Sequence, residues 1–185
     1  GQDITAYGID LYGRKALAEL LKKTVKIVKN IEWIRLLYTF PAHITDELLD
    51  IIATQERICN YIDVPLQHIS DSLLKKMNRK ISKRQTEDLI SNIRRKIPNV
   101  FLRSAFIVGL PGETEGNFQE LLDFIRKERF EKVGAFVYSR EEGTPAYDMP
   151  GQVPEFVKKK RLDQLMAQQQ EISKGVLKKF VSREL

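Results

Sequence analysis

Cysteine is almost missing from this sequence of 185 residues, which contains only Cys59. One thiol cannot form an intrachain disulfide, and with only two histidines the chain is not expected to build a zinc site of its own. Long apolar runs are absent too, and none approaches the roughly 18 residues that a membrane-spanning helix needs. Because no signal peptide opens the chain, we expect a cytoplasmic protein without a membrane partner.

The familiar catalytic and nucleotide-binding motifs are also missing. No GxGxxG follows a strand-like segment, and the chain has no GxxxxGK[ST] loop, no HExxH pair and no GxSxG elbow. These absences argue against dinucleotide, P-loop, zinc-protease and serine-hydrolase sites of the usual kinds.

Basic residues outnumber acidic ones and give a net charge of +6, a mild preference for anionic partners such as RNA. The densest basic patch contains no acidic residue and consists of Lys75, Lys76, Arg79, Lys80, Lys83 and Arg84. A second run, Lys158-Lys159-Lys160-Arg161, opens the last expected helix. Each run is a candidate RNA contact or simply a solvated helix face, and the second interpretation is the commoner one for such runs.

Strand-like and helix-like segments alternate along the chain. Period-two and β-branched patterns predict strands at 33–40, 58–66, 101–108 and 132–138, and the polar start, residues 1–5, resembles the exit of a further strand. Helical periodicity and capping residues predict helices at 15–28, 45–52, 70–77, 82–96, 114–129 and 154–181. Strands separated by helices form right-handed βαβ units, so we expect an α/β fold with a parallel sheet.

The segment Phe106-Ile-Val-Gly-Leu-Pro-Gly-Glu-Thr-Glu115 is the most informative stretch of the chain. A strand stops at Gly109, the chain turns through Leu-Pro-Gly, and a helix starts at Thr114. Such turns place bare backbone at the carboxyl end of a strand, where α/β proteins bind ligands. An ordinary strand–turn–helix corner is the alternative. Glu113 and Glu115 would repel a phosphate at this helix start, although both suit the helix dipole.

Polar residues follow the other predicted strands as well. Gln67 and His68 come after the second strand, Glu141 and Glu142 follow the fourth, and Gln2 and Asp3 stand at the start of the chain. In a parallel barrel these strand ends meet on one face. Taken singly, each has a structural explanation: His68 could cap the next helix, and Arg103, inside a strand, could bind an anionic ligand or form a salt bridge.

Three segments together resemble the radical S-adenosylmethionine (SAM) methylthiotransferases: DVPLQHISDSLLKKMNR (63–79), LRSAFIVGLPGETEGNF (102–118) and GAFVYSREEGTPA (134–146). Their order and spacing match the family over nearly the whole chain, with Leu110 replacing a usual phenylalanine. The resemblance implies a partial (β/α)6 TIM-like barrel over residues 1–150, without the first strand and the cluster-binding loop. It also implies that residues 151–185 form a long C-terminal helix leading toward an RNA-binding-type β-domain that is absent here.

The resemblance further implies the cofactors and their contacts. SAM and two [4Fe–4S] clusters serve these enzymes, but the cluster cysteines are absent here, so this chain is expected to hold no metal and to be inactive on its own. The residues expected to bind SAM are Gln2, Asp3, Gln67, His68, Arg103, Ile107, Val108 and Gly109. The residues expected on the substrate side are Tyr138, Glu141 and Glu142. No residue is identified with certainty as catalytic.

Details of the motifs are most similar to the branch of the family that modifies an aspartate of small-subunit ribosomal protein twelve. Leu102-Arg103-Ser104 before the Ile-Val-Gly strand and Glu141-Glu142 before Gly-Thr favour this branch. The implied reaction adds a methylthio group after a SAM-derived radical abstracts hydrogen from the β-carbon of that aspartate. A tRNA adenosine methylthiotransferase is the main alternative, and a non-enzymatic α/β interaction module is the second.

Overall fold

The computed structural model describes residues 2–178 and residue 181, and the chain divides into two compact units. The first unit comprises Gly1–Pro65 and Arg84–Arg103, and the second comprises Leu66–Lys83 and Ser104–Leu185. Strand β2 (Phe101–Val108) crosses the boundary between the units. The sheet has the strand order β1-β2-β3 with parallel strands, so the predicted α/β fold is confirmed.

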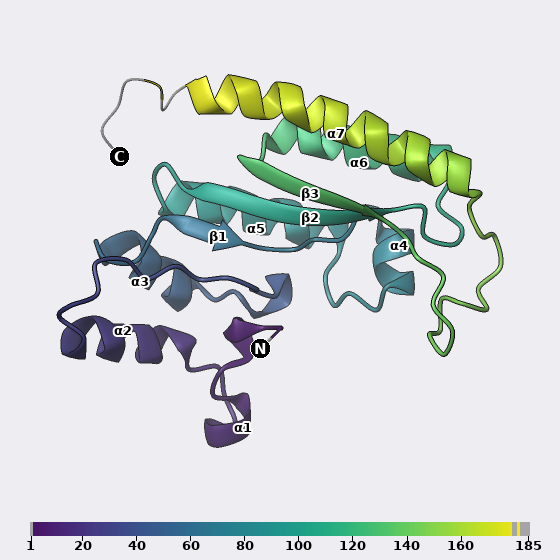
Figure 1. Cartoon of the computed structure of the whole chain (residues 1–185). Coiled ribbons are helices and arrows are strands. Elements are labelled where there is room, and N and C mark those ends of the chain that lie inside the picture. Colours follow the sequence, from purple (N-terminus) through teal and green to yellow (C-terminus); the bar gives the residue numbers. More distant parts are fainter. Residues whose placement is uncertain (1, 179–180, 182–185) are drawn as a thin grey trace. The chain divides into compact units, whose positions relative to one another are not determined.

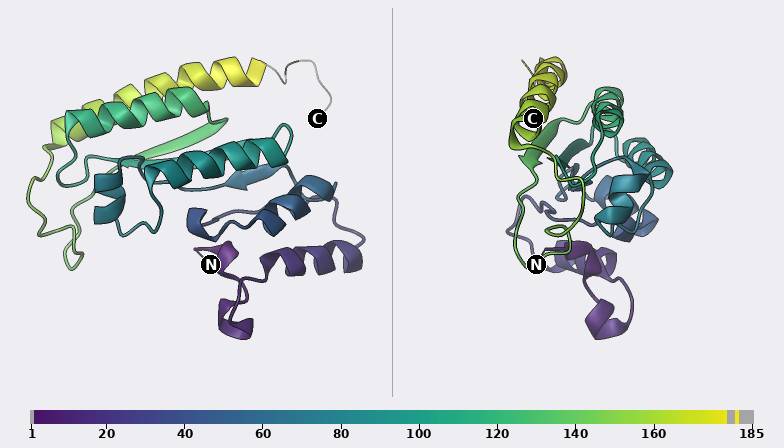
Figure 2. Two further views of the ribbon diagram at one scale, coloured as in Figure 1. Left: turned by 180° about the vertical axis from the view of Figure 1, so that it is seen from behind. Right: turned by 90° about the vertical axis from the view of Figure 1, so that its right-hand side faces the viewer.

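The first unit is built mainly from helices around a short strand (Figure 1). Its helices are α1 (Ile9–Tyr12), α2 (Leu17–Ile27), α3 (Asp46–Thr54) and α5 (Lys83–Lys96), with 3-10 turns at Ile4–Ala6 and Pro41–His43. Strand β1 (Tyr61–Asp63) pairs in parallel with the start of β2, with Asp63 opposite Arg103. Helices α2 and α3 run side by side (Figure 2), and each buries apolar side chains: Leu17 and Leu21 on α2, and Leu48, Leu49 and Ile52 on α3.

The segment 33–40 is not a strand, so this prediction is wrong. Only Ile34 makes a bridge, in parallel with Ile58, and Thr39 donates its amide to Asp63 O at 3.1 Å. Between these contacts Tyr38 has a φ of 61°, in the left-handed region. A residue in that conformation turns the backbone away from the extended path, and the ladder is therefore interrupted although the residues themselves favour a strand.

The second unit packs helices around the rest of β2 and strand β3 (Lys132–Val137). Its helices are α4 (Asp71–Lys76), α6 (Glu115–Glu128) and α7 (Glu155–Leu177), and α7 packs on both β3 and α6 (Figure 1). Phe106 lies at the centre of an aromatic cluster with Phe124 and Phe130, at ring-centroid distances of 6.4 and 6.0 Å. Aromatic pairs of this kind contribute about 0.5–1.5 kcal/mol beyond the area that they bury.

Most predicted elements are confirmed within a few residues. The strand at 101–108 coincides with β2, and the predicted 114–129 helix is α6, whose cap Thr114 forms a capping box with Asn117. The predicted 58–66 strand shortens to β1, with isolated bridges at Ile58 and Gln67. The last predicted helix corresponds to α7, and residues 179–180 of that prediction lie outside the described residues, as does Gly1 of the predicted strand exit. The boundary predicted near residue 150 stays a prediction.

Candidate functional site

The turn after β2 is shaped by two glycines in left-handed conformations. Gly109 has a φ of 79° and Gly112 a φ of 78°, and the amide of Glu113 donates to Leu110 O at 2.9 Å. Residues other than glycine rarely adopt these φ angles. The sequence Gly-Leu-Pro-Gly therefore permits a turn that few other sequences allow. The turn returns the chain from β2 to the start of α6.

Glu113 closes this turn with a fully buried carboxylate. One of its oxygens accepts hydrogen bonds from the Gly109 amide and from Nη1 of Arg161, the latter at 3.0 Å. The other oxygen lies 3.3 Å from Nε2 of His68. Three donors around one buried carboxylate replace the water that burial removes from it. From the sequence, Glu113 was expected only to complement the helix dipole; the anchoring role depends on Arg161 and His68, which are distant from Glu113 along the chain.

His68 is oriented by contacts at both ring nitrogens. Its Nδ1 accepts a hydrogen bond from the Ser70 amide at 3.0 Å, so the ring proton lies on Nε2, which donates to Glu113. The side chain is completely buried. In this arrangement His68 supports the turn through Glu113, and its predicted contact with SAM stays a prediction.

Lys158 of α7 occupies the space beside Gly109. A Cβ atom built on Gly109 would collide with the aliphatic stem of this lysine. The lysine ammonium donates to Tyr138 O at 3.0 Å and lies 5.1 Å from the centre of the Tyr138 ring. The space beside Gly109 on this side is therefore filled by the protein itself, and the predicted contact of Gly109 with SAM stays a prediction.

The other side of β2 leaves an apolar surface partly open. Within the second unit Ala105 and Ile107 are half-exposed, while Val108 is fully buried on the opposite face. Gln67 pairs with this strand through its backbone, donating to Ala105 O and accepting from the Ile107 amide, both at 2.8 Å. On β3, Phe136 is 60% exposed. The half-exposed aliphatic side chains of β2 are candidates for contact with a flat, mainly apolar ligand.

Gln67 holds this position in a strained conformation. Its φ of 71° lies in the left-handed region, which costs a residue with a side chain about 1–2 kcal/mol. Strain of this kind often accompanies functional positions, because the surrounding contacts must enforce it. The two backbone hydrogen bonds to β2 enforce it here.

Arg103 is one of the predicted SAM-binding residues in the first unit, and it pairs with a carboxylate of the protein. Arg103 lies 3.5 Å from Asp63, so it forms the salt bridge that the sequence left as an alternative to anion binding. Its side chain is nevertheless 39% exposed, which leaves guanidinium donors accessible. Asp63 is buried and also accepts the Tyr38 amide at 3.2 Å. Burial and the Asp63 charge raise the pKa of the neighbouring Tyr61, and Arg103 opposes that rise.

Asp3 caps the first 3-10 turn and pairs with a histidine. It accepts a hydrogen bond from the Thr5 amide at 2.9 Å, and its other oxygen lies 2.7 Å from His43 Nδ1. Partial burial raises the pKa of Asp3, but the bonds to Thr5 and His43 together lower it below its ordinary value. Asp3 also borders an open hollow of about 520 Å³, and Gln2 beside it is exposed.

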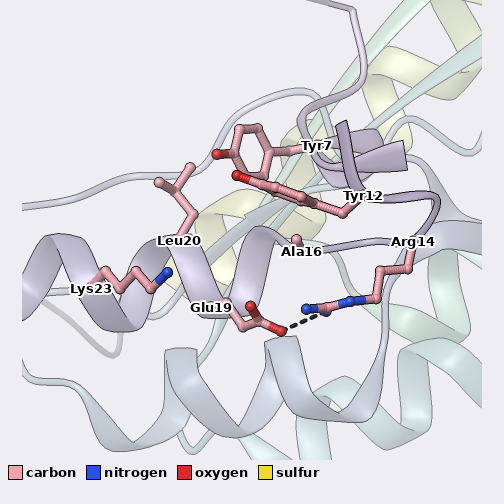
Figure 3. Close-up of a pocket in the computed structure, with 7 residues that line it drawn as sticks. All are labelled: Tyr7, Tyr12, Arg14, Ala16, Glu19, Leu20 and Lys23. Atoms are coloured by element: carbon pink, nitrogen blue, oxygen red, sulfur yellow. Dashed lines mark hydrogen bonds and ion pairs between the residues drawn. The ribbon is translucent and has the colours of Figure 1, made fainter. Parts of the chain in front are cut away.

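A second, smaller pocket of about 150 Å³ lies between α1 and α2 in the same unit (Figure 3). The rings of Tyr7 and Tyr12 meet edge to face at 6.5 Å, and Arg14 reaches Glu19 at 2.5 Å. The contact with Tyr12 raises the pKa of Tyr7. None of the residues predicted from the sequence lines this pocket.

The predicted substrate-side residues follow β3. Tyr138 donates its amide to Val108 O at 2.8 Å, which places it beside the end of β2. Its hydroxyl is buried and has no hydrogen-bond partner among the described residues. Glu141 and Glu142 are exposed, and Glu141 accepts a hydrogen bond from Ser139 at 2.5 Å. Buried polar groups usually have a hydrogen-bond partner, so this hydroxyl is an exception among the described residues.

The basic patch of residues 75–84 is partly neutralised. Lys83 pairs with Glu120 at 2.8 Å, Arg84 lies 3.9 Å from Asp88, and Lys76 donates to Pro111 O at 3.2 Å. Lys75 and Lys80 are exposed and make no ion pair within the part of the chain that the structure describes. Lys75 and Lys80 are thus candidates for the predicted RNA contact, which stays a prediction.

The described residues fit the organic part of SAM but not an iron–sulfur cluster. The open surface of β2, Gln67 and the unpaired Tyr138 hydroxyl offer apolar area and polar groups. In contrast, no group of three or more His, Cys, Asp or Glu side chains in residues 2–178 could hold a metal ion, and Cys59 is isolated. Among the same residues, no helix has the length and apolar character required to cross a membrane.

The chain is similar over nearly its whole length to curated ribosomal protein methylthiotransferases. The chain is 50% identical over 182 residues to the ribosomal protein uS12 methylthiotransferase RimO of Clostridium acetobutylicum, covering 98% of this chain and 41% of that protein. RimO of Pelotomaculum thermopropionicum is 52% identical over 172 residues, which cover 93% of this chain and 38% of that protein. The chain thus spans about two fifths of the length of these relatives.

The fold has a counterpart among solved structures as well. The radical SAM enzyme coproporphyrinogen III oxidase (HemN) from Escherichia coli superposes with a TM-score of 0.66 at 17% identity, covering 84% of this chain and 36% of that one. Residues 4–125, well over half of the chain, match the family model of the radical SAM superfamily. The chain therefore belongs to the radical SAM superfamily.

Proposed function

We propose that this chain is the SAM-binding portion of a methylthiotransferase that modifies an aspartate of ribosomal protein uS12. The observation that carries the proposal is the identity of about half of all residues, over 98% of the chain, to a protein named for this activity. The site supports it, since the turn at 109–113 and the open surface of β2 suit a nucleoside-bearing cofactor. A ribosomal substrate implies a cytoplasmic location.

The second unit would bind the adenosyl part of SAM. Ile107 and the backbone at the end of β2 would contact the adenine, and Gln67 would provide an amide at its polar edge. The carbonyl of Val108, which already accepts a hydrogen bond from the Tyr138 amide, would form part of the backbone that contacts the adenine. The buried side chain of Val108 anchors the strand in the core. The side chains of His68 and Glu113 are fully buried and would stabilise the turn from the interior of the unit.

The first unit, taken by itself, offers charged groups that suit a carboxylate or an ammonium group of a ligand such as SAM. Arg103 has accessible guanidinium donors for a carboxylate, and Asp3, which is ionised at neutral pH, suits an ammonium group. Gln2 is exposed beside Asp3 and adds a neutral amide. When bound, SAM and an iron–sulfur cluster supply the radical chemistry. Since Cys59 is the sole cysteine, residues 1–185 alone are expected to bind no cluster and to be inactive.

The substrate would approach the residues after β3. Tyr138 offers a buried hydroxyl without a partner in the described part of the chain, and Glu141 and Glu142 offer exposed carboxylates. uS12 lies within an RNA-rich particle, so the exposed Lys75 and Lys80 would contact neighbouring RNA phosphates. This contact predicts that binding to ribosomes weakens as salt rises and that replacing both lysines with glutamine reduces the salt dependence.

Mass spectrometry of uS12 tests the proposed activity. The full-length enzyme, with its clusters reconstituted, would be incubated with uS12 or small ribosomal subunits, SAM and a reductant. We expect one aspartate of uS12 to gain a methylthio group, and a reaction without SAM to leave the protein unchanged. A methylthiolated tRNA adenosine with unmodified uS12 would instead assign the enzyme to the tRNA-modifying branch. A full-length protein without SAM affinity would indicate a non-enzymatic module.

A further inference from the structure

The basic run at the start of α7 divides into two pairs with opposite surroundings. Lys159 and Lys160 are exposed, whereas Lys158 and Arg161 are buried, with 2% and 6% of their surface accessible. Residues three positions apart lie on the same face of a helix, so the two buried cations point toward the same neighbours. A buried cation is costly unless it is paired, which means that this pair must be held by specific partners.

Arg161 is held by the turn that follows β2. Its Nη1 donates to both the carbonyl and the carboxylate of Glu113, at 3.2 and 3.0 Å, and its Nη2 reaches Glu115 at 3.2 Å. The guanidinium also lies 5.4 Å from the centre of the Phe118 ring. One α7 side chain therefore fixes the backbone and side chain of the residue whose carboxylate holds the Gly109 amide.

Lys158 holds the same region from an adjacent position. Its stem fills the space over Gly109, and its ammonium donates to the carbonyl of Tyr138, the residue that follows β3. The ammonium is also paired with Glu155 at 2.6 Å, so its charge is compensated. Lys158 thus contacts the ends of β2 and β3 at once, and Arg161 contacts the turn that connects β2 to α6.

We infer that Lys158 and Arg161 are positioning residues for the cofactor site, through which α7 sets the backbone conformation at Gly109. Neither residue needs to touch SAM. Arg161 acts through Glu113 and its bond to the Gly109 amide, and Lys158 acts by packing on Gly109. The inference rests on the proposed function, because it assumes that the end of β2 binds the adenosyl group.

Variants of Arg161 in the full-length holoenzyme test the inference. Arg161→Ala removes the donors to Glu113, Arg161→Lys keeps the charge but not the fork geometry, and Lys160→Ala is the matched control on the exposed face. Two quantities are measured: hydrogen exchange of the amides at 109–113, and the dissociation constant of SAM. For Arg161→Ala we expect faster exchange and a SAM dissociation constant raised about 2- to 30-fold. Arg161→Lys should be intermediate, and Lys160→Ala should match the wild type.

Lys158 offers an independent test if Arg161→Ala does not fold. Lys158→Met keeps an unbranched stem over Gly109, whereas Lys158→Ala opens this space. We expect Lys158→Ala to weaken SAM binding more than Lys158→Met does. Equal SAM affinity in the wild type, Arg161→Ala and Lys158→Ala would overturn the inference. If the wild type binds SAM but leaves uS12 unmodified, the proposed substrate is wrong, and the affinity differences still decide the role of α7.

Discussion

Replacing Glu113 with alanine should destabilise the protein strongly, because this carboxylate has three buried partners. Among the described residues, the substitution leaves the buried charge of Arg161 with Glu115 as its one ion-pair partner, and the Glu115 side chain is 77% exposed. It also removes the acceptor of the Gly109 amide and the partner of His68 Nε2. These groups cannot recover hydrogen bonds to water without opening the turn.

The magnitude follows from the burial of the pair. Removing one partner of a buried ion pair costs about 3–5 kcal/mol, since the remaining charge is left without compensation. Losing the acceptor of a buried amide alone costs about 1–3 kcal/mol, and the two costs overlap because they involve one carboxylate. For a chain of this size each kcal/mol lowers the melting temperature by about 2–4 °C. Glu115→Ala is the matched control, because an exposed partner of the same arginine contributes only about 0–1 kcal/mol.

Denaturation by guanidinium chloride, followed by circular dichroism, measures these differences. We expect Glu113→Ala to lower the free energy of unfolding by several kcal/mol more than Glu115→Ala does. The double variant Glu113→Ala/Arg161→Ala should be less destabilised than the sum of the single variants, because it leaves no uncompensated charge. Equal stability of Glu113→Ala and Glu115→Ala would refute the role of Glu113 as the anchor of the turn.

Three further predictions concern single positions. Because the bonds from Thr5 and His43 depress the pKa of Asp3, its ionised form stabilises the fold above its ordinary pKa of 3.8, and this contribution is lost as the pH falls below that value. Unfolding of Asp3→Asn should therefore be easier than that of the wild type at neutral pH but equally easy in strong acid, and a difference that persists in acid would contradict this sign. In thermal unfolding, Gly109→Ala should lower the free energy of unfolding by about 1–3 kcal/mol more than Gly143→Ala does. Both glycines have a φ near 78°, but of the two only Gly109 has a side chain packed over it. Gln67→Gly should relieve its left-handed strain and stabilise the fold by up to about 1 kcal/mol while weakening SAM binding, and unchanged SAM affinity in a dialysis assay would remove Gln67 from the proposed site.

The sequence predicted best those elements whose signals are local. Strand β2 alternates buried and half-exposed residues along its entire length, and Thr114 caps α6 with its own side chain and that of Asn117. The Gly-Leu-Pro-Gly turn was equally predictable, because its glycines adopt angles that other residues avoid. Each of these features depends on residues fewer than ten positions apart, so no knowledge of the tertiary structure was required.

The segment 33–40 shows where local signals fail. Its β-branched and aromatic residues favour a strand, yet Tyr38 adopts a left-handed conformation and its amide bonds to the side chain of Asp63. A partner 25 residues away thus outweighs the local preference. The same limit applies to Arg103, for which the sequence offered anion binding or a salt bridge, and the structure places Asp63 at 3.5 Å.

Local patterns of residue type are sufficient to predict the parallel α/β order, the turn after β2 and the resemblance to a radical SAM family. Which charges are buried depends instead on how distant segments pack together. Lys158 and Lys159 are adjacent and chemically identical, but α7 packs one of them over Gly109 and leaves the other in solvent. Helical rotation and the position of the neighbouring strand ends make this difference, and neither is encoded in a run of four basic residues. The carboxylate of Glu113 acquired its role in the same way, from an arginine 48 residues further along the chain.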